Sequence, residues 1–307
     1  MVNDQCNKVA TIGFFDGVHR GHQHLLRQVL EVAHQRHMAS LVVTFFQQPR
    51  HVVTHETDRF FLLTTTNEKL HLLQQAGIDH CEVMEFTPEL ALMTAHDFMQ
   101  LLHDKYGVSA LVIGYDHRFG HNREEGFEDY VRYGEELGIE VVQNSAFDVS
   151  GVNVSSSVIR SFLQEGEVEM AARCLGYPYF LIGKVTTGVQ EGRKLGFPTA
   201  NIEVAEEKLI PASGVYAVRA RLEGTVEMKH AMMNIGTRPT FGTNAQTLEV
   251  HILKFEDDIY EQRLLVEFSH RMRGERKFKT PAELAEQLQK DAAEVEKHFE
   301  EDNDEDR

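Results

Sequence analysis

The order of apolar and amphipathic segments is the feature that most restricts how this chain can fold. Between residue 8 and about residue 145, short apolar runs alternate with stretches of helical spacing, which is the pattern of a doubly wound α/β domain with a parallel sheet. The expected strands have the sequences KVATIGFF, ASLVVTF, CEVMEF, SALVIG and IEVVQN. Thr65 and Glu68 have the spacing of a capping box, which predicts that a helix begins there and closes on Gly77.

The pattern changes beyond Phe180. Two short helical segments, SVIRSFLQEG and VEMAARCLG, come before the change, and the apolar runs after it are separated only by loops. These runs, YFLIGKV, GVYAVRARL, HAMMNIG, TLEVHIL and RLLVEF, predict an antiparallel sheet or a small β-barrel. A capping box that starts at Thr280 and contains a proline predicts a terminal helix. We therefore expect two domains, residues 1–178 and 179–307.

Composition argues against several classes of protein. The net charge of -17 argues against a general nucleic-acid surface, which needs a basic face. No run approaches the ~18 apolar residues of a membrane span, and the N-terminus lacks the pattern of a secretory signal, so we expect a cytoplasmic protein without a membrane partner. Three widely spaced cysteines predict neither a disulfide framework nor a zinc site. The acidic stretch after Ala293 is expected to fray into solvent.

The stretch TIGFFDGVHRGH, from Thr11 to His22, joins an expected strand to an expected helix. In a doubly wound sheet such a turn lies at the carboxyl edge of the strands, where a helix N-terminus offers unpaired N–H groups to an anion. Gly17 and Gly21 allow the backbone to approach phosphate oxygens, and His19 and His22 project from the same side of the first turn. The stretch therefore predicts a phosphate site in which two imidazoles donate hydrogen bonds to charge that grows in the transition state.

The same stretch resembles the HxGH signature of nucleotidyltransferases. Its exact sequence, GFFDGVHRGH, resembles that of the bacterial bifunctional riboflavin kinase/FMN adenylyltransferase (FAD synthetase) family. Later segments resemble that family's pattern in its order: LTTTNEKLHLL, IGYDHRFGHNREEG, VNVSSSVIRSFLQEGEVEMAARCLGYPYFLIGKV and EGRKLGFPTANI. The likeness covers roughly residues 8–298. It implies a Rossmann-like nucleotidyltransferase domain that joins FMN and ATP to give FAD and pyrophosphate, followed by a small antiparallel β-barrel that phosphorylates riboflavin with ATP.

The resemblance implies roles for residues of the first domain. His19 and His22 would stabilise the ATP phosphates, Arg160 would clamp the departing pyrophosphate, and Asp116 and Phe119 would help to seat the flavin. The residues expected to hold ATP or phosphate are Gly13, Phe15, Asp16, Gly17, Gly21, Ser155, Ser156 and Arg160. No side-chain nucleophile or base is expected, because the phosphate of FMN is ionised at pH 7 and can attack the α-phosphorus directly.

The reaction implied for the second domain requires a general base, because the primary alcohol of riboflavin is a poor nucleophile until its proton is removed. Glu249 matches the family's base, and alternation places it on one face of its strand with Thr247 and His251. Thr199 and Asn201 match the family's Mg²⁺ and phosphate ligands. Both lie at the end of a glycine-rich loop, GVQEGRKLGFPTAN. The residues of this loop that are expected to contact ATP are Gly188, Gly192, Gly196, Pro198 and Asn201. Three further candidates lie in NIGTRPTFG: Asn234, the flavin contact Arg238, and Thr240.

Two segments depart from the family pattern. The family usually reads SSTRIR where this chain has SSSVIR, so Val158 replaces an arginine and weaker pyrophosphate binding is expected. The family's TFEPHP is here TFFQQP, from Thr44 to Pro49, which loses a carboxylate and a histidine. None of the motifs specifies an oligomeric state.

Three alternative functions stay open at this point: an adenylyltransferase whose second domain has lost kinase activity, a nucleotidyltransferase with another acceptor, and a flavin-binding or regulatory protein without activity. The intact Thr199, Asn201 and Glu249 argue against the first and the third. The second leaves residues 180–298 unexplained.

Overall fold

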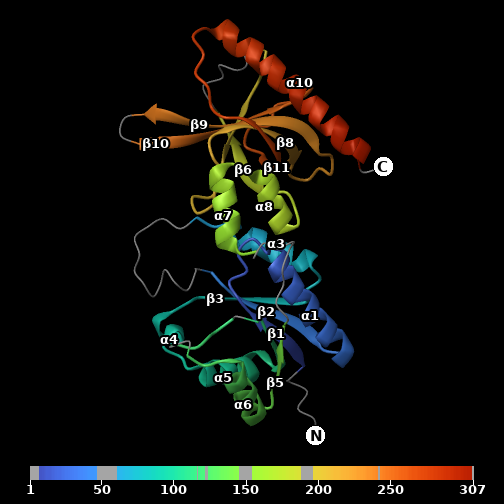
Figure 1. Cartoon of the computed structure of the whole chain (residues 1–307), viewed down its shortest axis with the longest axis vertical. Coiled ribbons are helices and arrows are strands. Elements are labelled where there is room, and N and C mark those ends of the chain that lie inside the picture. The colour runs from blue at the N-terminus through green and yellow to red at the C-terminus, as the bar shows by residue number, and fades with distance from the viewer. Residues whose placement is uncertain are drawn as a thin grey trace. The chain divides into compact units, whose positions relative to one another are not determined.

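The computed structural model describes residues 7–46, 61–115, 117–121, 124–144, 154–187, 196–240 and 243–305, with side chains described except at 237–240, 243–245 and 302–305. The chain forms two compact units, Met1–Ser156 and Ser157–Arg307. Figure 1 shows the parallel sheet with its helices in the first unit, and the barrel with its terminal helix in the second.

The described part of the first unit contains a five-stranded parallel sheet in the order β3-β2-β1-β4-β5. Its strands are β1 (Lys8–Ile12), β2 (Ala39–Phe45), β3 (His80–Met84), β4 (Val108–Ile113) and β5 (Glu140–Gln143). The chain moves outward from β1 through β2 and β3, then returns to the other side of β1 for β4. The strand order therefore reverses between β1 and β4, where sheets of this kind bind ligands. The expected doubly wound α/β fold is confirmed.

Helices pack on both faces of this sheet. They are α1 (Arg20–Arg36), α3 (Thr66–Gln75), α4 (Pro88–Ala91), α5 (Ala95–Tyr106) and α6 (Phe127–Leu137). Successive strand residues point to opposite faces, so Val9 packs with Leu26 of α1 and Ala10 packs with Leu102 of α5. The capping box predicted for α3 is confirmed, because Thr65 and Glu68 each accept a hydrogen bond from the other's backbone N–H.

The second unit is a closed barrel in the order β10-β7-β6-β11-β8-β9. Its strands are β6 (Phe180–Thr186), β7 (Ala200–Glu203), β8 (Gly214–Leu222), β9 (Lys229–Thr240), β10 (Thr243–Ile252) and β11 (Arg263–Arg273). The antiparallel barrel is confirmed. The sequence did not predict β7, because this four-residue strand has no apolar alternation that separates it from the preceding loop.

Two helices join the barrel as part of the second unit: α7 (Ser156–Glu165), which starts at the last residue of the first unit, and α8 (Val168–Leu175). The N–H of Ala212 donates to the carbonyl of Leu163 at 2.9 Å, and Arg271 Nη1 donates to the carbonyl of Glu165 at 2.9 Å. These contacts explain why the compact unit begins before the change of sequence pattern near residue 178.

The terminal helix α10 (Pro281–Glu305) packs along the barrel. Val295 and Phe299 are fully buried in a cluster with Met232, and Asp291, 1% exposed, accepts paired hydrogen bonds from Arg273. The helix therefore continues to Glu305, and the fraying expected after Ala293 is wrong over this range, because apolar contacts outweigh the acidic composition. Among the described helices, none has the length and apolar content needed to cross a bilayer.

Candidate active sites

The loop from Gly13 to His19 leaves β1 at the carboxyl edge of the sheet and leads into α1. Phe15, Gly17 and Val18 have φ values of 54°, 78° and 35°, in the left-handed region that costs energy for residues other than glycine. Phe15 and Val18 are each 1% exposed and belong to the core that α1 covers. Tertiary packing therefore holds the loop in a conformation that its sequence would not favour alone.

The imidazoles of His19 and His22 lie against each other, with ring centroids 3.6 Å apart. His19 also caps α1, because its Nδ1 accepts a hydrogen bond from the backbone N–H of His22 at 3.3 Å. Burial lowers the pKa of His22 well below its usual value, and the nearby His19, His117 and Lys69 act in the same direction. His22 is therefore neutral at pH 7, and its buried Nδ1 has no hydrogen-bond partner among the described residues.

Glycines make room for this arrangement. A Cβ on Gly21 would lie 3.2 Å from Nδ1 of His19, and a Cβ on Gly13 would lie 2.9 Å from the Phe15 ring. These two glycines thus allow aromatic rings to pack against the backbone. Gly17 is required for its positive φ.

The carboxylate of Asp16 is 3% exposed and binds the segment that precedes α3. It accepts hydrogen bonds from the backbone N–H groups of Leu63 at 3.2 Å and Thr64 at 3.0 Å. The Thr64 hydroxyl in turn accepts one from the N–H of Gly17 at 3.0 Å. Asp16 therefore fixes the loop from Gly13 to His19 to the start of α3.

Asp16→Asn is expected to lower the free energy of unfolding by about 1–3 kcal/mol, because the amide NH₂ must face a buried backbone N–H and leaves that donor unpaired. Chemical denaturation of the full chain measures this loss. Asp104→Asn, at a side chain that is 62% exposed, is the matched control. Equal unfolding midpoints for Asp16→Asn and the wild type would contradict the structural role of this carboxylate.

The segment SSSVIR, which is expected to bind phosphate, begins beside the same loop. The hydroxyl of Ser156 donates to the carbonyl of Asp16 at 2.9 Å, and Ser155 precedes it in the chain. Arg160 lies one helical turn later on α7, in the second compact unit. Its role in binding pyrophosphate stays a prediction.

An apolar cavity of about 280 Å³ opens next to the loop. It is lined by Ile12, Gly13, Phe14, Phe45, Phe86, Leu90, Ala91, Met93, Phe98, His117, Arg118, Phe119 and Gly120. Phe119 is 8% exposed and stacks on Tyr130 with ring centroids 4.2 Å apart, so it is a core aromatic that also forms part of the cavity wall. Asp116, the other expected flavin contact, lies outside the described residues.

In the second unit, strand register brings together residues that are distant in sequence. Glu249 on β10 lies opposite Asn201 on β7 and opposite Asn234 on β9. Residues directly opposite each other share a face of the sheet, so a half-buried carboxylate has an amide side chain on each side. Thr247 and Gly236 form the next pair along the same face.

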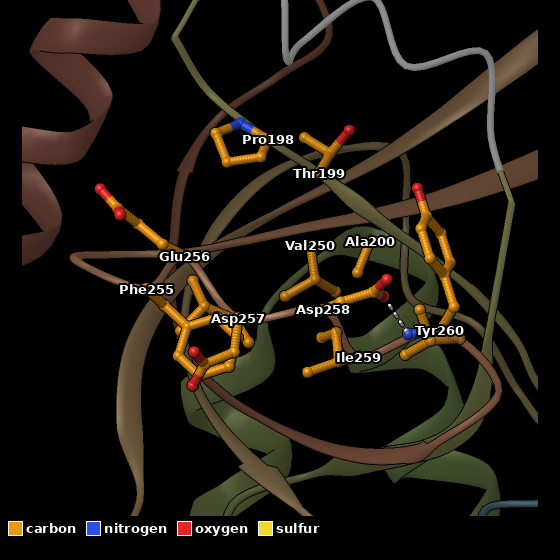
Figure 2. A pocket seen from close by; sticks show the side chains of 12 residues that line it. Pro198, Thr199, Ala200, Val250, Phe255, Glu256, Asp257, Asp258, Ile259 and Tyr260 are labelled. Atoms are coloured by element: carbon orange, nitrogen blue, oxygen red, sulfur yellow. Dashed lines mark hydrogen bonds between the residues drawn. The ribbon is translucent and has the colours of Figure 1, made fainter.

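A second cavity, of about 360 Å³, lies at the start of β7. Figure 2 shows Pro198 and Thr199 on one side of this cavity and the segment from Phe255 to Tyr260 on the other. Val250 also lines it, and alternation along β10 therefore puts the cavity and Glu249 on opposite faces. Thr199 lies on the rim of the cavity, two residues before Asn201.

The positions of four further residues expected at the second site, or of their side chains, are not described. Gly188 and Gly192 lie outside the described residues. Arg238 and Thr240 lie on β9, opposite Ala245 and Thr243, and their side chains are not described. Gly196 has a φ of 83°, which favours glycine there.

Two residues to which the sequence assigned no role lie near the barrel face that bears Glu249 and Asn234. His251 is 8% exposed, and its Nδ1 donates to the carbonyl of Pro198 at 2.7 Å, which fixes the segment that carries Thr199. A Cβ on Gly236 would lie 3.1 Å from Oε1 of Glu275, so this carboxylate reaches the face that bears Asn234. The alternation of TLEVHIL pointed to His251, whereas nothing in the sequence links Glu275 to this face.

Family models match both parts of the chain: a model described as FAD synthetase matches residues 1–158, and one described as riboflavin kinase matches residues 175–299. A bifunctional riboflavin kinase/FMN adenylyltransferase from Listeria monocytogenes is 35% identical over 95% of this chain and 93% of its own. The protein with the same description from Escherichia coli K12 is 36% identical over 92% of this chain and 90% of its own.

The fold also matches a solved structure over nearly its whole length. A crystal structure described as a macrolide-efflux protein from Streptococcus pneumoniae has a TM-score of 0.88 and 28% identity, and the match covers 94% of each chain. That description is a statement about the other protein, whereas both halves of the present chain match flavin-synthesising families. The chain therefore belongs to the bifunctional riboflavin kinase/FMN adenylyltransferase family, whose two activities produce FMN and FAD.

Proposed function

We propose that this chain carries out the two reactions at separate sites, with residues 1–178 as the FMN adenylyltransferase domain and residues 179–307 as the riboflavin kinase domain. Its substrates are riboflavin, FMN and ATP, and we expect it to act in the cytoplasm. The observation that supports the proposal is the alignment of Glu249 between Asn201 and Asn234, in which a carboxylate that could act as a base has an amide side chain on each side on one face of the barrel.

In the adenylylation step, a phosphate oxygen of FMN attacks the α-phosphorus of ATP, the bond from the α-phosphorus to the bridging oxygen breaks, and pyrophosphate leaves. His19 and His22, at the mouth of α1, donate hydrogen bonds to the ATP phosphates. The neutral state of His22 supports this role, because a buried neutral imidazole donates without the cost of burying a charge. The aromatic cavity beside the loop has the apolar character that the flavin ring requires.

In the kinase step, Glu249 takes the proton of the riboflavin 5′-hydroxyl, the oxygen attacks the γ-phosphorus of ATP, and ADP leaves. The hydroxyl of Thr199 and the amide oxygen of Asn201 are hard oxygen donors of the kind that Mg²⁺ prefers, so these two side chains would hold it. When bound there, Mg²⁺ would neutralise part of the phosphate charge and so favour attack at the γ-phosphorus. His251 keeps Thr199 in place through Pro198.

Incubation of the purified chain with riboflavin, ATP and magnesium tests the proposal. Chromatography should show FMN first and FAD later, and FMN supplied without riboflavin should give FAD and pyrophosphate. FAD from supplied FMN without any FMN from riboflavin would identify a monofunctional adenylyltransferase. Bound flavin without turnover would identify a binding protein.

A further inference from the structure

A buried lysine lies directly behind the adenylyltransferase loop. Lys69, in the first turn of α3, is 2% exposed. Its ammonium group donates to the carbonyl of Phe45 at 2.9 Å and to the carbonyl of Phe14 at 3.1 Å, and it lies 4.5 Å from the centre of the Phe14 ring. A lysine is rarely buried to this extent, because burial removes the water that solvates its ammonium charge.

The two carbonyls mark the ends of neighbouring strands. Phe45 is the last residue of β2, and Phe14 follows the point where β1 leaves the sheet, after the N–H of Gly13 donates to the carbonyl of Val43 at 3.0 Å. The carbonyl of Phe14 also accepts a hydrogen bond from the hydroxyl of Thr44 at 3.1 Å. The side chain of Lys69 therefore bridges the ends of β1 and β2, beyond the backbone hydrogen bond between Gly13 and Val43.

Both phenylalanines also line the apolar cavity. Phe14 in addition begins the turn that leads through Asp16 to the histidines, and Asp16 is held by Leu63 and Thr64 from the same segment that carries Lys69. Residues 63–69 therefore hold the loop from Gly13 to His19 on one side and the wall of the apolar cavity on the other.

We propose that Lys69 is a positioning residue for FMN adenylylation, which as a cation sets the spacing between the cavity that takes the flavin and the loop that takes the phosphates. The inference rests on the proposed function of the first unit. It assigns Lys69 no contact with substrate, since its hydrogen bonds go to Phe14 and Phe45.

The charge of Lys69 is expected to change at a mildly alkaline pH. Burial lowers the pKa of Lys69 to about 8, against the opposing effect of the nearby Asp16 carboxylate. Among the described residues, the other ionisable groups close by are His22, whose pKa is also lowered, and Glu68, whose carboxylate accepts a hydrogen bond from the N–H of Thr65. Lys69 is therefore a cation below about pH 8 and loses that charge above it, so FAD synthesis should decline on the alkaline side.

The experiment compares the purified full chain with Lys69→Met, Lys69→Arg and the exposed control Lys105→Met, between pH 6 and pH 10. Each sample is assayed for both half-reactions, with kcat and KM for FMN determined separately. Lys69→Met should lose about 10²-fold in kcat/KM for FMN, because a misplaced reacting group costs that much, and should keep its riboflavin kinase activity. Lys69→Arg stays charged throughout, so it should recover part of the activity and lack the alkaline decline near pH 8.

Wild-type values of kcat/KM for FMN in Lys69→Met would overturn the proposal, and so would an equal loss of both half-reactions. If Lys69→Met does not fold, the wild-type profile still decides: a decline near pH 8 in FAD synthesis but not in FMN synthesis supports the role, and its absence overturns it. A wild type without any FAD synthesis would instead contradict the proposed function.

Discussion

Glu249→Gln is expected to lower riboflavin phosphorylation by about 10²–10⁴-fold, the effect of losing a general base, while supplied FMN still becomes FAD. The amide keeps the shape and hydrogen-bonding reach of the side chain between Asn201 and Asn234 but cannot take a proton. Attack by FMN needs no such base, because its phosphate is already ionised. The substitution therefore separates the two reactions by their chemistry.

Steady-state assays of each half-reaction on the purified variant measure the effect. Glu223→Gln, at an exposed glutamate just after β8 of the same barrel, is the matched control and should retain both activities. A general loss of folding would depress both half-reactions, and a glutamate without a catalytic role would leave both unchanged. Either of these results would remove Glu249 as the base.

His22→Ala should have the opposite selectivity and lower FAD formation by about 10²–10³-fold, the effect of losing a preorganised hydrogen-bond donor, while FMN accumulates. The imidazole is held by the His19 ring at 3.6 Å and by the edge contact with Phe15, with centroids 5.0 Å apart. It can therefore meet the phosphates without reorganisation. Alanine removes the donor and leaves the cap of His19 on α1, because that hydrogen bond uses the backbone N–H of residue 22.

Product analysis from riboflavin, ATP and magnesium gives the result directly, as the ratio of FAD to FMN over time. His34→Ala, at an exposed histidine near the end of α1, controls for the loss of an imidazole from the helix. Thermal unfolding of both variants separates a catalytic effect from the loss of ring stacking. FAD synthesis near the wild-type rate in His22→Ala would exclude the phosphate role of this residue.

The sequence by itself determined the fold class and the family. Alternating apolar runs specify strands with little help from distant contacts, because their period follows from backbone geometry, and the order of elements then leaves few topologies. The capping box at Thr65 was readable for the same reason, since both of its partners lie within one helical turn. The motifs that named the family are also local, as in TIGFFDGVHRGH and GFPTAN.

Only the tertiary structure decided what depends on residues far apart in the chain. The alignment of Glu249 with Asn201 and Asn234 follows from barrel register, and the extent of α10 follows from burial of Val295 and Phe299 against the barrel, although its composition predicted fraying. Lys69 reads in sequence as one polar residue of an amphipathic helix. Its burial becomes visible only when α3 packs beside the ends of β1 and β2, because the two carbonyls that hold its charge are 24 and 55 residues away.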